Sequence, residues 1–332
     1  MAYQLSLLDK SPVAEGETPA AALQRTLQLA KQAEKWGYHR FWLTEHHNIE
    51  QLASPSPEVL IAWLVAQTQH IRIGSGGVML QHYSPYKVAE NFNLLASLAP
   101  GRIDLGIGKA PGGLPLSTRA LQLGVHQDEK GSFAEQLQQL DSWLQPDVER
   151  HDDERLRATP LPARPAQRFL LGGSEQSAQL AAQLGWQFVF AAHINGDRQR
   201  LERSLQAYSR QAQGKRALVA VQVVVADSPA QADLLVADLK HFHVQVKGGP
   251  GVNVASLEQA ERYVRQGGFT DYLIEPRTPS LLKGTASQVH AQLDALQHNF
   301  GIDEFVIDTP IADARARYRS LELLATHQWV AA

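Results

Sequence analysis

The chain has 332 residues, of which 44% are hydrophobic and 20% are charged, as expected for a globular protein with a sizeable core. Its formal net charge of −3 provides no basic surface of the kind that nucleic acids or anionic membranes attract, so neither is expected as a partner. The absence of cysteine excludes disulfides, thiolate metal sites and cysteine nucleophiles, so redox chemistry would require a bound cofactor.

Short apolar runs alternate with longer amphipathic segments along the chain. The runs predict strands at 3–8, 40–43, 71–74, 102–107, 168–171, 187–190, 217–225 and 303–307. The helical period predicts helices at 19–36, 57–69, 84–98, 127–144, 175–184, 197–212, 228–240, 285–299 and 312–326. Such alternation is typical of parallel βαβ units. It predicts an α/β fold, a (β/α)8 TIM barrel formed by residues 1–332 as a single domain.

Two stretches interrupt the alternation. Residues 145–167 mix charges with prolines, which predicts a long surface excursion. Residues 241–284 contain a Gly-Gly-Pro-Gly turn and a short helical pattern at 256–266, which predicts an insertion in the seventh βα connection. Because the βα loops of such a barrel surround its active site, this insertion is a candidate lid, with an ordinary surface excursion as the alternative.

The segment Thr44-Glu45-His46-His47-Asn48 directly follows a predicted strand. In a barrel, polar residues at the C-terminal end of a strand face the catalytic mouth, and histidine suits proton transfer near neutral pH. Adjacent side chains near a strand end point to opposite faces, so one histidine should enter the mouth and the other should be structural. One alternative is a pair of loop histidines. The other is a metal site, which the absence of the i, i+4 spacing of helical zinc motifs disfavours.

Two glycine-rich segments end the third and fourth predicted strands, Gly74-Ser75-Gly76-Gly77 and Gly106-Ile107-Gly108-Lys109-Ala110-Pro111-Gly112-Gly113. Residues without a Cβ atom let the backbone approach a flat ligand, although a turn or bulge explains such a run equally well. The second segment is not a dinucleotide fingerprint, because Pro111 and the glycines after it interrupt the helix that the fingerprint requires. The chain also contains no P-loop.

The segment Gly172-Gly173-Ser174-Glu175-Gln176-Ser177 joins a predicted strand to a predicted helix. Glycines let backbone N–H groups turn inward, and a helix N-terminus attracts phosphate. Ser174 is also a plausible helix N-cap, and a purely structural cap is the alternative. The segment therefore predicts a cradle for a single phosphate at Gly173, Ser174 and Ser177.

Several of these segments together resemble the bacterial luciferase-like flavin monooxygenases. The resemblance covers about residues 3 to 327 and is closest to the single-chain subgroup of unassigned substrate. It rests on the motifs Leu8-Asp9-Lys10-Ser11-Pro12, Trp42-Leu43-Thr44-Glu45-His46-His47-Asn48, Ser54-Pro55-Ser56-Pro57-Glu58, Ile71-Arg72-Ile73-Gly74-Ser75-Gly76-Gly77-Val78-Met79-Leu80, Pro100-Gly101-Arg102-Ile103-Asp104-Leu105-Gly106-Ile107-Gly108, Gly284-Thr285 and Tyr318-Arg319-Ser320-Leu321-Glu322-Leu323-Leu324-Ala325.

The resemblance implies that FMN binds at the C-terminal ends of the strands. It implies that His46 is the catalytic acid/base, with Glu45 or Asn48 orienting the two histidines. The remaining implied contacts are a non-prolyl cis peptide at Gly76-Gly77 against the flavin ring, Gly108 and Lys109 beside the cofactor, and the flavin phosphate at Gly173, Ser174 and Ser177. Lys109 stands where related sequences commonly carry arginine, and Gly112-Gly113 replace an acidic or hydroxyl residue, so this part of the pocket departs from the family pattern.

The implied reaction uses reduced FMN from a separate reductase and O2, and it oxygenates a small organic substrate through a flavin C4a-hydroperoxide. The resemblance further implies a homodimer, and the start of the chain, which lacks a leader pattern, predicts a cytoplasmic protein. Three alternatives remain: a deazaflavin (F420)-dependent oxidoreductase that transfers hydride, a non-catalytic flavin-binding protein, and a phosphosugar lyase or isomerase. The Glu45-His46-His47 cluster disfavours the second, and the third leaves Gly76-Gly77 unexplained.

Overall fold

The computed structural model describes residues 3–124, 127–145, 156–194, 196–249 and 251–330. Its parallel strands form a barrel from β1 (Gln4–Asp9), β2 (Arg40–Leu43), β3 (Arg72–Ser75), β5 (Ile103–Gly108), β6 (Gln167–Gly172), β7 (Gln187–Ala191), β8 (Leu218–Val225) and β13 (Glu304–Asp308). These strands pair in chain order, and β8 pairs with both β7 and β13, which closes the ring. The short strand β4 (Val78–Met79) runs beside β5 beyond β3. The predicted (β/α)8 barrel is confirmed, and its description as one domain over 1–332 stays a prediction.

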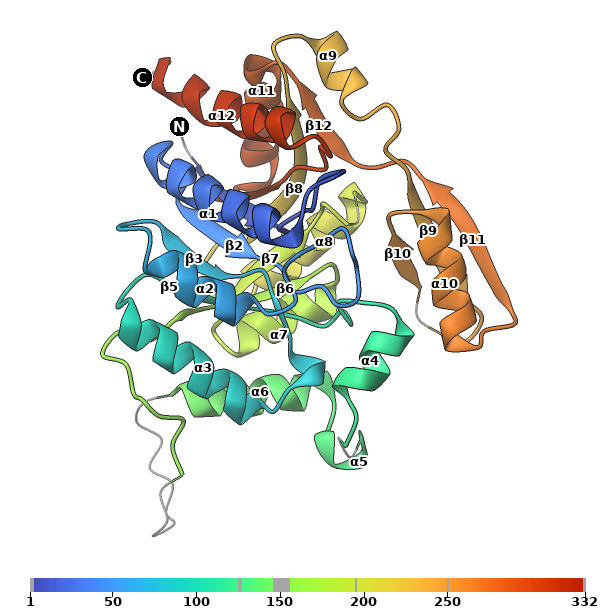
Figure 1. Cartoon of the computed structure of the whole chain (residues 1–332). Coiled ribbons are helices and arrows are strands. Elements are labelled where there is room, and N and C mark those ends of the chain that lie inside the picture. Colours follow the sequence, from blue (N-terminus) through green and yellow to red (C-terminus); the bar gives the residue numbers. More distant parts are fainter. Residues whose placement is uncertain (1–2, 125–126, 146–155, 195, 250, 331–332) are drawn as a thin grey trace.

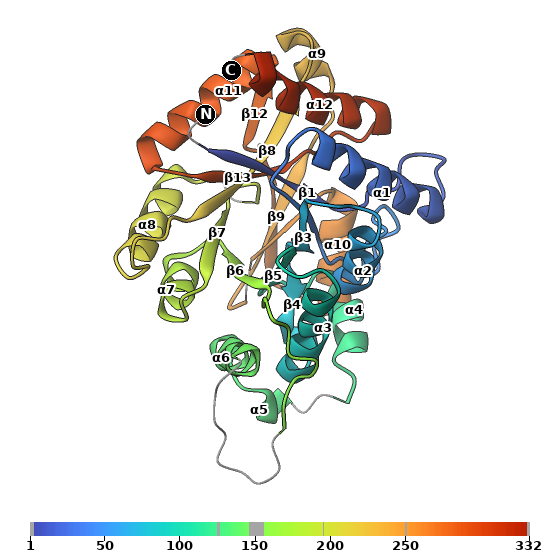
Figure 2. The ribbon, with the colours of Figure 1, turned by 90° about the vertical axis from the view of Figure 1, so that its left-hand side faces the viewer.

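Helices cover the outside of the barrel (Figures 1 and 2). They are α1 (Pro19–Lys35), α2 (Pro57–Val65), α3 (Pro85–Leu98), α6 (Phe133–Leu144), α7 (Glu175–Gln183), α8 (Arg198–Ser209), α11 (Ala286–Phe300) and α12 (Ala314–Val330). Proline occupies the first turn of α1, α2 and α3, where its missing N–H costs no hydrogen bond and its fixed φ favours the helix.

Two helical predictions need correction, and one helix was missed. The segment 228–240 forms only the short α9 (Pro229–Leu234), and Leu235 and Val236 after it pack against the cluster that contains Val224 and Ile311. The segment 127–144 is divided into α5 (Gln127–Lys130) and α6, since Ser132 and Glu135 form a capping box that starts a new helix. The helix α4 (Pro115–Leu121) was not predicted. The turn η1 (Leu80–His82) follows β4.

The barrel interior is arranged in layers because alternate strand residues point inward. The layer at the N-terminal ends is ionic: Arg40 lies 2.9 Å from Asp104 and 2.8 Å from Glu304. The middle layer is apolar and is formed by Leu8, Trp42, Phe169, Val189, Leu218, Ala220 and Val306, with Leu171 packed against it. The next inward positions of β1 and β13 are Lys10 and Asp308, so the layer at the C-terminal ends is polar.

The segment 241–284 forms a small unit of its own, inserted in the seventh βα connection as predicted. It contains β9 (His241–Val246), β10 (Val252–Val254), α10 (Leu257–Gly267), β11 (Tyr272–Arg277) and β12 (Leu281–Gly284). The first three strands form an antiparallel sheet in the order β10-β9-β11, on which α10 packs, and β12 returns to the barrel and pairs with β8. The antiparallel strands were not predicted.

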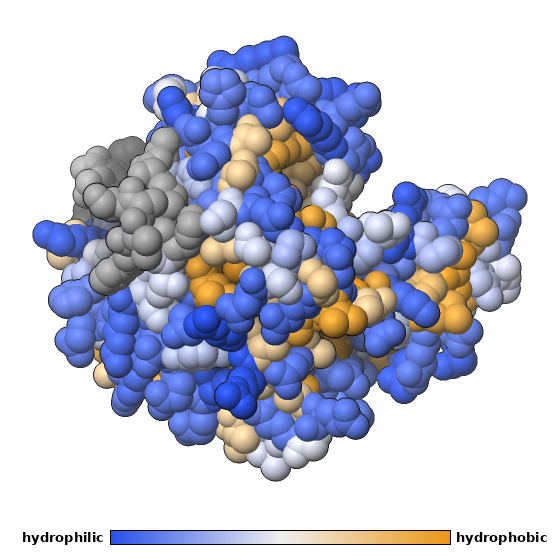
Figure 3. Space-filling view, turned by 90° about the horizontal axis from the view of Figure 1, so that it is seen from above, coloured by the Kyte–Doolittle hydropathy of each residue, from blue (hydrophilic) through white to orange (hydrophobic). Residues whose placement is uncertain are grey.

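The insertion stands beside the barrel and meets it at α4 (Figure 1). The Leu116 N–H donates to Gln266 Oε1 at 3.2 Å, and Arg119 donates to the Gln266 carbonyl at 3.1 Å. From above, the insertion is a separate lobe, and apolar surface lines the hollow between it and the barrel (Figure 3). Its role as a lid stays a prediction. In the predicted excursion 145–167, residues 156–166 contain no helix or strand, and 146–155 lie outside the described residues.

Candidate functional site

The two histidines after β2 point to opposite sides, as the alternation of side chains predicts. His46 Nδ1 lies 2.8 Å from Thr44 Oγ1, and the charged groups nearest to the His46 ring include Lys10 and Asp308 at the ends of β1 and β13. His47 is buried, and its Nε2 lies 2.7 Å from Glu45 Oε1. His46 therefore faces the barrel mouth, and His47 faces the surrounding loops.

The Glu45 carboxylate accepts hydrogen bonds from residues of the loops that surround the mouth. The residue is 1% exposed, and its Oε1 accepts hydrogen bonds from the His47 ring and, at 2.9 Å, from the Tyr83 hydroxyl. Oε2 accepts the Met79 N–H at 3.0 Å. These contacts fix the segment after β2 to the segment after β3. The structure thus brings Glu45 to His47. Thr44, to which the sequence assigned no role within the segment, lies within hydrogen-bond distance of His46. A catalytic role for Glu45 stays a prediction.

The glycines of β3 and β5 allow close packing of the backbone. The Gly76-Gly77 peptide is cis, which confirms that geometry, and its contact with a flavin ring stays a prediction. A Cβ atom on Gly77 would lie 2.7 Å from the Gly106 carbonyl oxygen, and one on Gly76 would lie 2.5 Å from Leu8 Cδ1. At Gly108 a Cβ would meet the Met79 methyl at 2.8 Å. Packing against the backbone therefore requires glycine at Gly77 whether or not a ligand is bound, whereas at Gly76 and Gly108 the nearest atoms belong to the ends of the Leu8 and Met79 side chains.

The predicted phosphate cradle has open space at the start of α7. Ser174 is the N-cap of α7, and its Oγ accepts the Ser177 N–H at 3.2 Å and lies 3.1 Å from Ser177 Oγ. A Cβ on Gly173 would meet no atom within 4 Å, whereas one on Gly172 would lie 2.5 Å from Ser177 Cβ. The structure therefore brings two hydroxyls and a helix N-terminus together beside a glycine that leaves room for a ligand.

Lys109 follows β5 with an exposed side chain. The contact that its main chain makes is with Gln81, whose amide donates to the Lys109 carbonyl at 2.9 Å. The neighbouring Gly112 carbonyl accepts the His47 N–H at 2.8 Å, so the glycines that depart from the family pattern hold the segment after β5 against the histidine segment. A contact between Lys109 and the cofactor stays a prediction.

Sequence reasoning missed four polar residues at the mouth, which we call the polar cluster: Lys10, His193, Gln222 and Asp308. Lys10 Nζ lies 2.7 Å from Asp308 Oδ2, and the Gln222 amide donates to the same oxygen at 3.1 Å. His193 follows β7 and interacts electrostatically with Lys10 and Asp308. A polar Gln222 inside the run Leu-Val-Ala-Val-Gln-Val-Val-Val was the available signal, because it marks an inward position that is not apolar.

Burial and neighbouring charges control ionisation at the mouth. Burial lowers the pKa of His46 to about 3, with a further lowering by the Lys10 charge. Burial likewise lowers the pKa of His193 to about 4. Burial acts to raise the pKa of Asp308, but the Lys10 charge, the interaction with His193 and the hydrogen bonds from Lys10 and Gln222 together outweigh it, and the pKa falls to about 2. At neutral pH both histidines are therefore uncharged and the Asp308 carboxylate is ionised.

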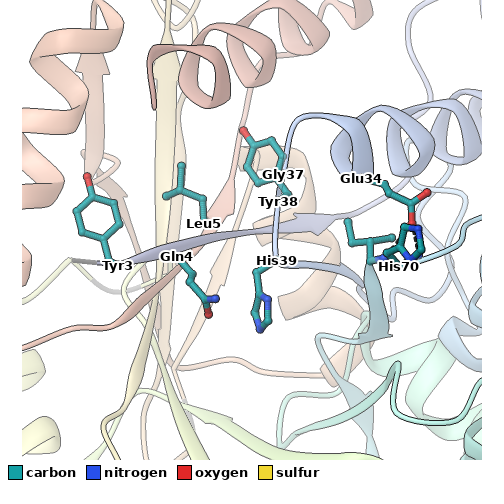
Figure 4. A pocket seen from close by; sticks show the side chains of 9 residues that line it. Tyr3, Gln4, Leu5, Glu34, Gly37, Tyr38, His39 and His70 are labelled. Atoms are coloured by element: carbon teal, nitrogen blue, oxygen red, sulfur yellow. Dashed lines mark hydrogen bonds between the residues drawn. The ribbon is translucent and has the colours of Figure 1, made fainter. Parts of the chain in front are cut away.

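A separate pocket lies at the N-terminal end of the barrel (Figure 4). Tyr3, Leu5 and His39 line it, and Glu34 lies beside His70. The Glu34 carboxylate accepts the backbone N–H groups of residues 69, 70 and 71, so its role there is to hold a loop. Residues at this face of a barrel usually serve stability, so the pocket is not the functional site.

Metal binding and membrane insertion have no support in the described ranges. They contain no group of three or more His, Asp or Glu side chains that could hold a metal ion. No helix within them is long and apolar enough to cross a membrane.

The chain combines a closed (β/α)8 barrel with histidine and glycine segments at the C-terminal ends of its strands. Known proteins with this combination identify its family. The family model for luciferase-like monooxygenases matches residues 3–304. N-acetyl-S-alkylcysteine monooxygenase of Bacillus subtilis is 44% identical over 327 residues, which covers 97% of both chains. A luciferase-like monooxygenase of Escherichia coli is 35% identical and covers 96% of this chain and 95% of its own. The chain therefore belongs to the luciferase-like monooxygenase family, and it is a monooxygenase.

Solved structures share the fold over nearly the whole chain. Apo-MsnO8 has a TM-score of 0.78 and 31% identity and covers 98% of both chains. The oxygenating constituent of 3,6-diketocamphane monooxygenase from Pseudomonas putida, in complex with FMN, has a TM-score of 0.69 and 19% identity, with coverage of 98% and 97%. An F420-dependent secondary alcohol dehydrogenase has a TM-score of 0.67 and 14% identity, with coverage of 97% and 98%. At such low identity, the last two show the likeness of the fold alone.

Proposed function

We propose that this protein is an FMN-dependent monooxygenase that uses reduced FMN and O2 to insert one oxygen atom into a small organic substrate. The observation that carries the proposal is the start of α7, where Gly173 leaves open space beside the Ser174 and Ser177 hydroxyls. A phosphate monoester fits this arrangement, because backbone N–H groups and hydroxyls can donate to its oxygens and the helix dipole favours its charge. The residues present therefore fit FMN.

The other functional residues lie where the remainder of such a cofactor would extend. From Ser174 after β6, the glycine-rich ends of β5 and β3 lead around the ring of strands to His46 after β2. Bound reduced flavin supplies the two electrons that activate O2, so that one oxygen atom enters the substrate and the other leaves as water. The protein supplies orientation, exclusion of water and a proton-transfer group, for which His46 is our candidate.

A separate reductase supplies the reduced FMN, and the protein works as a homodimer. The substrate is a thioether derivative of an amino acid, because the relative with 44% identity is an N-acetyl-S-alkylcysteine monooxygenase. The alternative cofactor is F420, which is bound by a protein of the same fold.

Changing Ser174 and Ser177 together to Ala should weaken binding of FMN more than binding of riboflavin, which lacks the phosphate. Loss of two hydroxyl contacts to a charged group predicts a decrease in FMN affinity of about ten- to hundredfold. Fluorescence titration of wild type and variant with FMN, riboflavin and F420 measures the effect. Equal losses of affinity for FMN and riboflavin would show that the phosphate does not bind at the start of α7. Preferential binding of F420 would favour the hydride-transferring alternative.

A further inference from the structure

The polar cluster of Lys10, His193, Gln222 and Asp308 occupies the part of the mouth that the cofactor proposal leaves unexplained. Its members come from the ends of β1, β7 and β13 and from the middle of β8, which are consecutive strands in the ring. The glycine segments and the phosphate cradle belong to β3, β5 and β6 on the other arc. His46 after β2 lies at one junction of the two arcs, near Lys10. A substrate bound at the ends of β7, β8, β13 and β1 would therefore lie beside His46.

Within the cluster, Lys10 is the charged group that a ligand can reach. The Lys10 side chain is 30% exposed, whereas the Asp308 side chain is 1% exposed and lies beneath it. Asp308 thus serves as the buried counter-ion that holds the ammonium at the mouth, and the Gln222 amide holds Asp308 in turn. An ammonium has three N–H donors, of which the pair with Asp308 uses one.

Two buried polar atoms of the cluster lack a hydrogen-bond partner in the described part of the chain. They are His193 Nδ1 and Gln222 Oε1. Buried polar groups are rarely left unpaired, since each such group costs stability. Within one cluster at its mouth, the described barrel thus contains a cation that can receive an anionic group and two unsatisfied acceptor atoms that can receive an N–H or O–H donor of a polar ligand.

We propose that the polar cluster binds the carboxylate group of the organic substrate, with Lys10 as the residue that determines specificity for an anion. The proposal rests on the proposed function, because it assigns the substrate to the same mouth. A carboxylate would accept from the Lys10 ammonium, whereas Gln222 Oε1 and the uncharged His193 Nδ1 are acceptors that an N–H or O–H group of the same substrate would satisfy. Because the cluster lies near His46, the rest of the substrate would lie beside the proton-transfer group. Asp308 positions Lys10 and does not contact the substrate.

The test compares an acid with its neutral amide on the FMN-loaded wild-type enzyme. The probes are N-acetyl-S-methylcysteine and its carboxamide, and isothermal titration calorimetry gives the dissociation constant of each. We expect the acid to bind about ten- to hundredfold more tightly than the amide, because a charge-assisted hydrogen bond is lost in the amide. Equal affinity for the two probes, or no binding of the acid, overturns the proposal. This comparison needs no variant, so misfolding cannot obscure it.

The variant Lys10→Gln removes the charge and keeps a side-chain N–H donor for Asp308. We expect it to lose the preference for the acid, with little change in affinity for the amide. The control is Lys283→Gln, which removes a positive charge from an exposed pair with Asp233 and should retain the preference. Retention of the preference in Lys10→Gln contradicts the role of Lys10.

The same preparations are assayed for FMN binding and for FMN-dependent oxygenation of the acid. Oxygenation of the acid without any preference for binding it over the amide overturns the carboxylate site and leaves the proposed function intact. A Lys10-dependent preference for binding the acid, without oxygenation of it, contradicts the proposed function and supports the carboxylate site.

Discussion

Replacement of His46 by Ala should slow turnover by a factor of about 10² to 10⁴, equivalent to about 3–5 kcal/mol of activation barrier, if His46 transfers a proton in the reaction. FMN affinity should change only modestly, because the proposed phosphate contacts lie after β6 and not after β2. The measurement is the steady-state rate of substrate oxygenation with reduced FMN, together with an FMN titration of the same variant.

His47→Ala is the matched control for this change. His47 is buried against Glu45, which still receives hydrogen bonds from Tyr83 and the Met79 N–H, so the variant should lose stability and retain most of its turnover. Thermal unfolding separates the two effects. A His46 variant with the wild-type rate, together with an inactive but folded His47 variant, would reverse the two roles.

Replacement of Arg40 by Met should lower the free energy of unfolding by about 3–5 kcal/mol, since it removes the cation paired with the buried Glu304 and one of the two guanidinium partners of Asp104, which keeps Arg72. Arg40 contacts Asp104 at 2.9 Å, Glu304 at 2.8 Å and Gln167 at 2.9 Å at the base of the barrel. Burial raises the pKa of Glu304, and the Arg40 guanidinium opposes that rise. Urea unfolding followed by circular dichroism measures the change.

Arg262→Met is the control for Arg40, because it removes the same kind of side chain from an exposed pair with Glu258 on α10. Little measurable change is expected there, as for most exposed ion pairs. If the two variants unfold at the same urea concentration, the ionic layer does not hold the barrel together as we describe.

The barrel could be predicted because its strands are short, apolar and separated by helical patterns. The insertion shows the limit of that reasoning. The segment His-Phe-His-Val-Gln-Val at β9 has the alternation of a strand, but its partners β10 and β11 are short or largely exposed, so composition gave them little apolar signal. The helix predicted over 228–240 ends at Leu234 instead, and its later apolar residues Leu235 and Val236 pack against a cluster with Val224 and Ile311.

The residues of the candidate site also differ in whether the sequence alone reveals them. Segments with an unusual composition, such as Glu45-His46-His47 and Gly76-Gly77, could be selected from the sequence alone. Lys10 and Asp308 could not, because a single charged residue after a strand resembles an ordinary strand end. Their pairing depends on β1 lying beside β13, with almost 300 residues between them in sequence. Only the closure of the barrel brings them together.

The measurement that most directly tests the central proposal is transfer of ¹⁸O from labelled O2 into product. Purified protein, chemically reduced FMN and N-acetyl-S-methylcysteine are mixed under ¹⁸O2, and the product is analysed by mass spectrometry. We predict one ¹⁸O atom per product molecule, with formation dependent on the protein and on FMN. Unlabelled product, no product, or substrate turnover by reduced or oxidised F420 without O2 would contradict an FMN-dependent monooxygenase.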